Sequence, residues 1–200
     1  MQPAARPAYP ATFEVDHPER ITNWKPLVQW LLALPHLVIL NALESLATSV
    51  AFISWFVILF TGRLPAGLAG LQNLYIRYMN RVYAYVAFVG EEYPPFAYDM
   101  TPADPRDHPT VRTALAPQLD DRNRVTVGFR LILAIPHIVV VAVLAVVAVV
   151  ALIIDAFVVL FTGTRSVGLR DFVVGVLRWN TRLNAYLLLL VDDYPPFSLD

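Results

Sequence analysis

The chain matches itself without a gap when each residue is compared with the residue 101 positions later, so residues 9–99 fall on residues 110–200. The matched blocks are Pro35-His36 with Pro136-His137, Leu59-Phe60-Thr61-Gly62 with Leu160-Phe161-Thr162-Gly163, and Tyr93-Pro94-Pro95-Phe96 with Tyr194-Pro195-Pro196-Phe197. Self-similarity at a fixed spacing is the signature of a repeat architecture. Any fold for this chain must therefore be built from two copies of one unit.

Each copy contains a long apolar segment, residues 27–60 in the first and residues 131–161 in the second. A helix that crosses the hydrocarbon core of a bilayer, about 30 Å thick, needs about 20 apolar residues. Both segments exceed that length but are too short for two crossings and a turn. We therefore expect one crossing from each, with Pro35 and Pro136 bounding or kinking the helix.

The overall composition points to a membrane protein. Apolar residues make up 57% of the chain and charged residues only 16%, against roughly 45–50% and about 25% in soluble domains. This balance excludes a disordered chain and a collagen-like fibre. The net charge of −1 argues against a nucleic-acid partner, because phosphate binding requires a basic excess.

A second helical segment follows a Thr-Gly break in each copy, at residues 68–89 and 169–191. Two alternatives fit it. The segment either crosses the bilayer with its arginines turned into the bundle, or lies in the interface as an amphipathic helix. We favour crossing. The predicted fold is then an all-α integral membrane protein of two helical hairpins with four transmembrane helices and short extramembrane β segments.

The domain organisation follows from the repeat. Residues 9–99 form the first membrane repeat and residues 110–200 the second, and a polar linker at residues 100–124 runs into the start of the second copy. More basic residues lie on the side of the linker than on the side of the Thr-Gly turns. Under four crossings, the positive-inside rule then predicts a multi-pass protein with cytoplasmic termini.

Charged side chains inside the apolar segments are the first candidate functional residues, since they are costly in a membrane. They are Arg77, Arg81, Arg178, Arg182, Asp155 and Glu44. Folding the second repeat as a hairpin predicts that Asp155 pairs with Arg178 or Arg182, whereas Glu44 lies nearer the first interface. These residues form either an ion path or anionic-lipid site, or structural ion pairs; we favour structural pairs.

Aromatic and histidine residues at the predicted interfaces are the second set of candidates. Amphipathic rings anchor at the headgroup level of a bilayer, and the two prolines of each Tyr-Pro-Pro-Phe block enforce an extended exit from the helix. The candidates are His36, His137, Trp24, Trp30, Tyr93, Phe96, Tyr194 and Phe197. Metal or haem ligation by the two histidines is the less favoured alternative.

No catalytic constellation is visible. The chain has no cysteine, which excludes disulfides and thiol chemistry, and no P-loop, dinucleotide-binding glycine pattern or zinc-protease motif occurs. We therefore expect a protein that is not an enzyme and has no metal or other cofactor.

Three stretches resemble a known family. They are YPATFEVDHPERITNWKPLVQWLLALPHLVIL, FISWFVILFTGRLPAGL and VGVLRWNTRLNAYLLLLVDDYPPF, and they are similar to the bacterial membrane family DUF 4389, a domain of unknown function, in two tandem copies. The second copy departs from the family pattern by lacking the Tyr-Pro start and the Pro-Glu-Arg triplet. The resemblance implies a bacterial membrane protein, which we expect in the inner membrane, and it supplies no activity or substrate.

The functional expectation is an integral membrane accessory or scaffold protein, a non-catalytic subunit or lipid-organising partner of a larger membrane complex. The alternative is a small oligomeric transporter or channel that uses the Arg-bearing helices. The expected partners are the lipid bilayer and either other membrane subunits or further copies of the chain.

Overall fold

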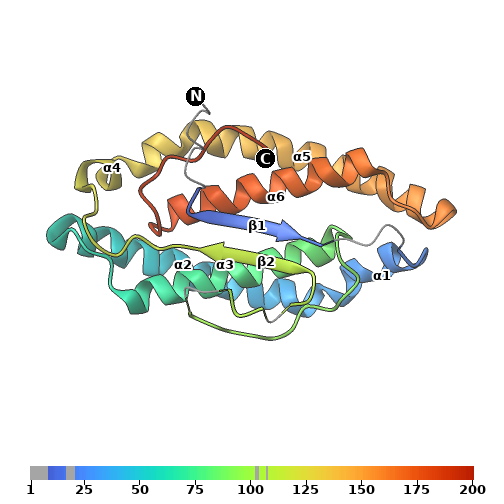
Figure 1. Ribbon diagram of the computed structural model, residues 1–200, viewed down its shortest axis with the longest axis horizontal. Coiled ribbons are helices and arrows are strands. Elements are labelled where there is room, and N and C mark those ends of the chain that lie inside the picture. The colour runs from blue at the N-terminus through green and yellow to red at the C-terminus, as the bar shows by residue number, and fades with distance from the viewer. Residues whose placement is uncertain (1–8, 17–20, 102–103, 107) are drawn as a thin grey trace, which may run out of the picture.

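The computed structural model describes residues 9–16, 21–101, 104–106 and 108–200. Residues 17–20, which precede the first apolar segment, and part of the linker lie outside the described residues. The elements in chain order are β1 (Ala11–Val15), α1 (Lys25–Leu32), α2 (Leu34–Thr61), α3 (Ala66–Val86), β2 (Val111–Leu115), α4 (Arg124–Gly128), α5 (Arg130–Thr162) and α6 (Val167–Leu187) (Figure 1).

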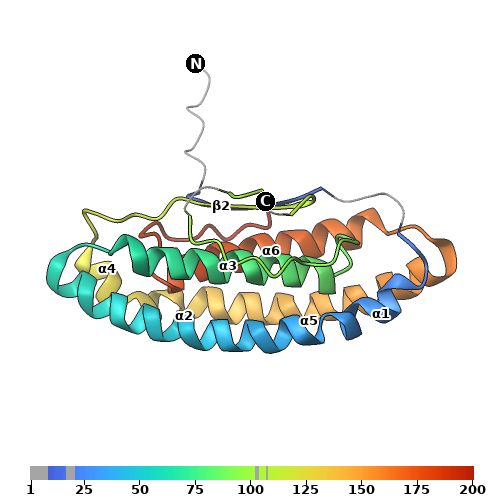
Figure 2. The same cartoon turned by 90° about the horizontal axis from the view of Figure 1, so that it is seen from below.

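The elements form three layers (Figure 2). An apolar layer contains the long helices α2 and α5 with the short helices α1 and α4 at their ends. A middle layer contains α3 and α6, which pack on α2 and α5 respectively. A polar layer on the opposite side contains β1, β2 and the extended segments that follow α3 and α6. The strands run along the same direction as the helices beneath them (Figure 1).

The two copies are related by an approximate two-fold axis through the sheet. The strands β1 and β2 pair antiparallel, with Phe13 opposite Thr113, and both bury alternate residues. The strands β1 and β2 are 100 residues apart in sequence, whereas the equivalent helices are 101 residues apart. The strand β2 therefore lies one residue further from the helices of its copy than β1 does. A two-stranded sheet is marginal in water, and here β1 packs on α6 and β2 packs on α3.

Each copy also reaches into the other at the ends of the long helices. The helix α1 packs against α5, and α4 packs against α2. The backbone N–H of Ile21 donates to the carbonyl of Gly163 at 3.3 Å, and that of Arg122 donates to the carbonyl of Gly62 at 3.1 Å. These bonds are equivalent under the 101-residue repeat, so the exchange is a property of both halves.

Local sequence explains where the long helices begin and end. The helix α2 begins after a break at Ala33, with Pro35 in its first turn, where a missing N–H costs nothing. The helix α5 instead continues through Pro136. Both end at a glycine in the left-handed conformation, Gly62 at φ 72° and Gly163 at φ 68°, as helix C-termini commonly do.

Among the residues that the structure describes, two helices, and not four, have the length and composition of a membrane span. They are α2 and α5, and only 22% of the apolar window of each is buried. The expectation that residues 68–89 and 169–191 also cross a bilayer is therefore wrong. The helices α3 and α6 end at Val86 and Leu187, and both are enclosed between the other two layers.

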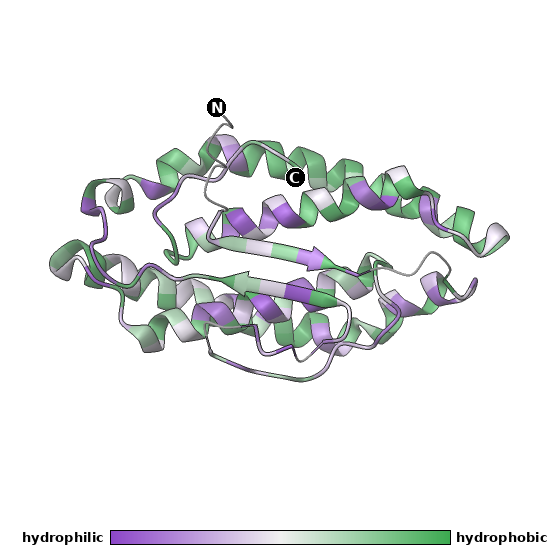
Figure 3. Cartoon of the chain, viewed as in Figure 1, coloured by the Kyte–Doolittle hydropathy of each residue, from purple (hydrophilic) through white to green (hydrophobic). Residues whose placement is uncertain are grey.

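The polarity of the middle layer is the physical reason for this difference. The helix α3 buries the polar side chains of Gln72, Asn73, Arg77, Asn80 and Arg81. Of these, Arg77, Asn80 and Arg81 donate hydrogen bonds to β2 and the extended segments. Figure 3 shows α5 almost uniformly hydrophobic and α3 and α6 banded with hydrophilic residues. A helix with so many polar groups is stable only where other polar groups cover them.

The two left-handed glycines predict different sensitivities to substitution. A Cβ atom at Gly163 would lie 2.7 Å from Oδ1 of Asn23, whereas at Gly62 it would lie 3.2 Å from the mobile end of Arg124. We expect Gly163→Ala to lower the free energy of unfolding by more than the roughly 1 kcal/mol typical of a left-handed alanine, and Gly62→Ala to lose about that amount. Gly168→Ala, where the Cβ meets nothing within 4 Å, is the matched control. Equal losses in denaturant unfolding at positions 62 and 163 would contradict the packing argument.

Candidate membrane-facing site

The outward face of the apolar layer is covered by large apolar side chains. Those more than half exposed include Trp24, Leu27, Trp30, Val38, Phe52, Ile53, Phe60, Phe129, Leu131, Ile132, Val139, Val143, Val146, Ile153, Phe157 and Phe161. The helix α5 contacts the protein along one narrow stripe and exposes the rest of its circumference. Large contiguous apolar faces mark surfaces that bind a membrane or another protein.

Charge is almost absent from this face. Within residues 34–61 the only charged side chain is Glu44, and it is exposed. The charged residues of α5, Arg130 and Asp155, are both buried. Glu44 has no hydrogen bond or ion pair to the described residues, and its charge contributes after burial to the raised pKa of Tyr83 on α3.

Trp24 and Trp30, two of the expected interface residues, have exposed indole rings. They belong to α1 and its N-terminal edge, at one end of the apolar layer, and are 56% and 54% exposed. The N-terminal end of α1 is also polar, because Lys25 forms an ion pair with Glu91 at 2.5 Å. An indole next to a polar edge is typical of a side chain at a membrane–water interface.

The two histidines are buried instead of exposed at an interface. His36 accepts or donates a 2.6 Å hydrogen bond with the Tyr78 hydroxyl, and its ring stacks on Phe96. The rings of His36 and Tyr93 meet edge to face. From the sequence, His36, Tyr93 and Phe96 are expected only as interface residues. In the structure these three residues and Tyr78 contact one another and hold the Tyr-Pro-Pro-Phe segment against α2. We call this group the clasp.

The second copy repeats the clasp with one exchange. His137 accepts a 3.0 Å hydrogen bond from Nε1 of Trp179 and stacks on Phe197 at 3.9 Å between ring centroids. Tyr194 packs on the same ring and donates its hydroxyl to the carbonyl of Leu133. In both copies the histidine ring is therefore packed among aromatic rings of its own half.

The four helix arginines donate hydrogen bonds to backbone carbonyls of the polar layer, three to the extended segments and one to β1. Arg81 donates to the carbonyl of Ala97 at 2.6 Å, and the equivalent Arg182 donates to the carbonyl of Ser198 at 2.5 Å. Arg77 donates to the carbonyl of Thr101. Arg178 donates to the carbonyl of Phe13 in β1 at 3.2 Å, so in each case a guanidinium satisfies a backbone acceptor of the polar layer.

The predicted pairing of Asp155 with Arg178 or Arg182 is wrong. Asp155 pairs with Arg165, which follows the Thr-Gly turn, at 2.6 Å, and both side chains are 1% exposed. Arg165 also donates to the carbonyl of Phe88 at the end of α3. The hairpin argument aligned depths along α5 and α6, but the turn itself folds back and places its own arginine on Asp155.

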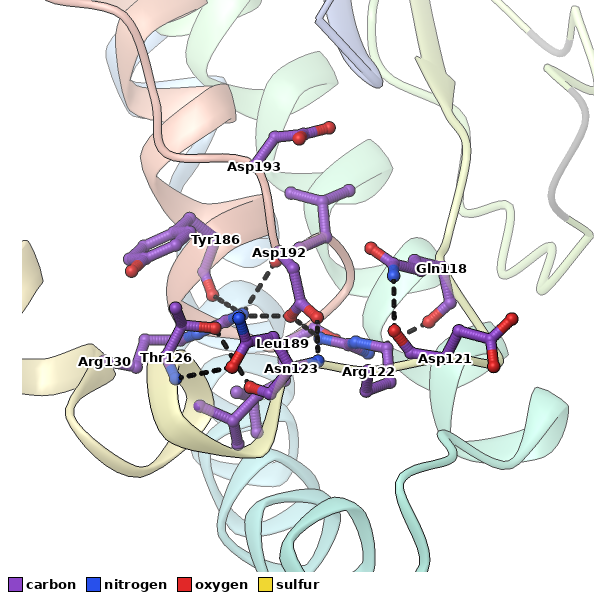
Figure 4. Close-up of polar contacts among 12 residues, drawn as sticks. Gln118, Asp121, Arg122, Asn123, Thr126, Arg130, Tyr186, Leu189, Asp192 and Asp193 are labelled. Atoms are coloured by element: carbon purple, nitrogen blue, oxygen red, sulfur yellow. Dashed lines mark hydrogen bonds and ion pairs between the residues drawn. The ribbon is translucent and has the colours of Figure 1, made fainter.

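A second buried ionic cluster was missed from the sequence (Figure 4). Arg122 and Arg130 both donate to Oδ1 of Asp192, at 2.7 Å and 2.5 Å. Arg122 also donates to the carbonyl of Leu189, which is the repeat equivalent of Phe88. The acidic pair that precedes each Tyr-Pro-Pro-Phe block was the available signal, because Asp192 repeats Glu91.

The two clusters perform the same task. The helices α3 and α6 end inside the protein, where their last carbonyls have no helical partner. Arg165 caps α3 and Arg122 caps α6. The two arginines are not repeat equivalents, and both belong to the second copy. Arg165 reaches the end of α3 in the first copy, whereas Arg122 caps the helix of its own copy.

The charge of Asp192 is stabilised where it lies. Burial alone would raise its pKa, but hydrogen bonds from Arg122 and from the backbone N–H of Asn123, with the charges of Arg122 and Arg130, lower the pKa below its ordinary value.

Among the residues that the structure describes, no three His, Cys, Asp or Glu side chains gather closely enough to hold a metal ion.

The repeat supplies a test of the Asp155–Arg165 pair, since the first copy has Ser54 and Leu64 at the same places. We expect Asp155→Ser to lower the free energy of unfolding by about 3 kcal/mol or more, because a buried guanidinium is left uncompensated. The double variant Asp155→Ser with Arg165→Leu should recover more than half of that loss. Denaturant unfolding in mild detergent measures both, and a double variant no more stable than the single one would refute the pairing argument.

The Asp192 cluster predicts acid lability. The pKa of Asp192 is lower in the folded protein than the 3.8 of a free aspartate. The stabilisation of the fold by the Asp192 charge is therefore fully present above the pKa of the free aspartate, and it is lost as the pH falls through the lower pKa of the folded protein. We expect the melting temperature to fall steeply below about pH 4. Asp192→Asn should be less stable at pH 7 and should flatten the fall below pH 4; an unchanged acid slope would count against the cluster.

Comparison with known proteins places the chain in one family. The model of the family described as "Domain of unknown function (DUF4389)" matches residues 23–97 and residues 124–198. No curated protein and no solved structure matches the chain. The two matches cover three quarters of the sequence, one on each copy, and confirm the resemblance. The chain therefore belongs to the DUF4389 family, as two tandem copies of its domain.

Proposed function

We propose that this protein is a non-catalytic scaffold that lies in the plane of a membrane. In this arrangement the apolar layer faces the acyl chains of one leaflet and the polar layer faces water. The strands, the extended segments and the linker then form a surface on which other membrane-associated proteins assemble.

The observation that carries this proposal is the position of the sheet. The sheet covers the middle of the helical layers on one side, and its strands run along the helices (Figures 1 and 2). Its outer side exposes Thr12, Glu14 and Arg112. The apolar side chains are exposed on the opposite side, so the molecule has one face for lipid and one for water.

An orientation across the bilayer conflicts with this arrangement. Helices that crossed the bilayer would carry the sheet into the hydrocarbon core, because the sheet lies beside their middle. Open sheet edges do not occur in contact with lipid, since their backbone groups would lack partners. Glu14 and Arg112 would add the cost of exposed charges at the same depth.

The lengths of the two apolar helices also favour the in-plane orientation. The 28 residues of α2 and the 33 residues of α5 extend roughly 42 Å and 50 Å at 1.5 Å per residue. A hydrocarbon core of about 30 Å would leave a large excess. A helix lying in the interface has no such limit on its length.

The contacts of the arginines support a scaffold over a transporter. Arg77, Arg81 and Arg182 donate to carbonyls of the chain's own extended segments. They therefore fix the shape of the polar layer. We place the protein at the bacterial inner membrane, with the polar layer and the C-terminal segment toward the cytoplasm.

Depth measurements on α5 test the orientation, and the absence of native cysteine permits single labels. Val139→Cys, Val146→Cys and Ile153→Cys lie seven residues apart at exposed positions, so they share one helix face. In vesicles of phosphatidylcholine and phosphatidylglycerol, we expect spin labels at all three sites to show the same immersion depth. A crossing helix would instead displace the outer two labels from the middle one by about 10 Å each.

Thr12→Cys on the sheet is the control for the water-facing side. Its label should be accessible to a water-soluble relaxation agent in the same vesicles. A depth that peaks at Val146, or a protected label at Thr12, would overturn the in-plane orientation. A solute flux across proteoliposomes that Arg77→Ala abolishes would favour the transporter instead.

A further inference from the structure

The chain has an apolar cavity of about 370 Å³ at one end of the membrane-facing layer. It lies between α1 of the first copy and α5 of the second, with the end of α3 as its floor. The side chains that shape it are Leu27, Trp30, Phe88, Leu152, Ala156 and Phe157. Its volume is within the range of about 300–1,000 Å³ that ligand sites occupy.

The rim and the floor of this cavity differ in exposure. Leu27, Trp30 and Phe157 at the rim are 54%, 54% and 58% exposed, whereas Phe88 is 8% exposed. The cavity therefore opens on the face of α1 and α5 that the proposed function turns toward lipid. All of its lining residues have apolar side chains, or in Trp30 a largely apolar ring.

The other half of the molecule shows the same position filled. The equivalent of Ala156 is Trp55, whose indole Nε1 donates to the carbonyl of Val127 at 3.0 Å. Val127 is the equivalent of Pro26, which lines the cavity. A single exchange between the copies, tryptophan to alanine, thus removes the side chain that closes the junction between a long helix and the short helix of the other copy.

The α1 side of the cavity differs in the opposite sense. Leu27 and Trp30 stand where the second copy has Gly128 and Leu131. The larger side chains extend the apolar wall outward around the opening. The cavity is therefore deepened at Ala156 and walled by Leu27 and Trp30, as a site for an elongated apolar group requires.

We propose that this cavity binds one acyl chain of a bilayer lipid. The inference rests on the proposed in-plane orientation, which supplies the lipid at the opening. The lining offers contact to methylene groups, each of which gains free energy when it leaves water. The chain enters between Trp30 and Phe157 and extends over Ala156 toward Phe88, so the lipid ties the first copy to the second.

Photo-crosslinking tests the site. The full chain is reconstituted in phosphatidylcholine vesicles that contain a phosphatidylcholine with a diazirine in its acyl chain, and the crosslinked peptides are mapped. We expect crosslinks to concentrate at α1 and at residues 149–160, above the level at the exposed stretch 139–147. Ala156→Trp copies the side chain of the other half and should reduce the crosslinks at the cavity by about tenfold, the change expected when two methylene groups lose their contacts.

Two further variants control for indirect effects. Val146→Trp adds the same ring on the exposed face of α5, outside the cavity, and should leave the pattern unchanged. Trp55→Ala should open the equivalent junction and add crosslinks at α4. If Ala156→Trp does not fold, Ala156→Leu fills part of the cavity and should give an intermediate reduction.

The outcomes separate the two proposals. Uniform crosslinking along α2 and α5 that Ala156→Trp leaves unchanged would refute the cavity site, while uniform spin-label depths would still support the in-plane orientation. Depths typical of a crossing helix would refute the orientation, and crosslinks confined to the cavity would then show a lipid site in a different setting. Loss of crosslinks in both Ala156→Trp and Val146→Trp would show a general effect on vesicle binding and would overturn the assignment to the cavity.

Discussion

Buried polar groups on α3 and α6 impose the constraint on which the rest of the structure depends. These helices carry buried arginines and amides, and a buried donor without an acceptor costs free energy. The side chains reach strands and extended segments instead of lipid: Asn80 donates to Thr113 of β2 and accepts from Thr181 of α6. The sheet and the two Tyr-Pro-Pro-Phe segments are therefore the cover of a polar helical layer, and the apolar helices are left to the other side.

Much of the architecture could be predicted from the sequence, because hydrophobic runs and turn residues act locally. The duplication and the apolar character of α2 and α5 follow from spacing and composition, and the resemblance of three stretches to the family is confirmed by the family model. The number of spanning helices could not be predicted in this way. The arginines of α3 and α6 suit either a bundle interior or a polar cover, and only the position of the strands distinguishes these two cases.

The candidate residues also divide into those whose contacts could be predicted from the sequence and those whose contacts could not. His36 and His137 each pack against the Tyr-Pro-Pro-Phe segment of their own copy, and the sequence had singled out both histidines and the aromatic residues of both segments. The partner of Asp155 was not predictable from helix depth, because Arg165 lies in a turn whose path depends on long-range packing. Trp179 and Arg122 were missed because they matter through contacts with residues far away in sequence.

The exchange of α1 and α4 between the copies has a consequence for chains that carry one copy of this domain. The strand of a single copy would have no partner, and its short helix would have no long helix to cover. Two such chains, related by a true two-fold axis, could make the same contacts that Ile21 makes with Gly163 and Arg122 makes with Gly62. The internal symmetry of this protein is thus the geometry of a symmetric dimer. Because both copies belong to one chain, equivalent positions can carry different residues, as Trp55 and Ala156 do.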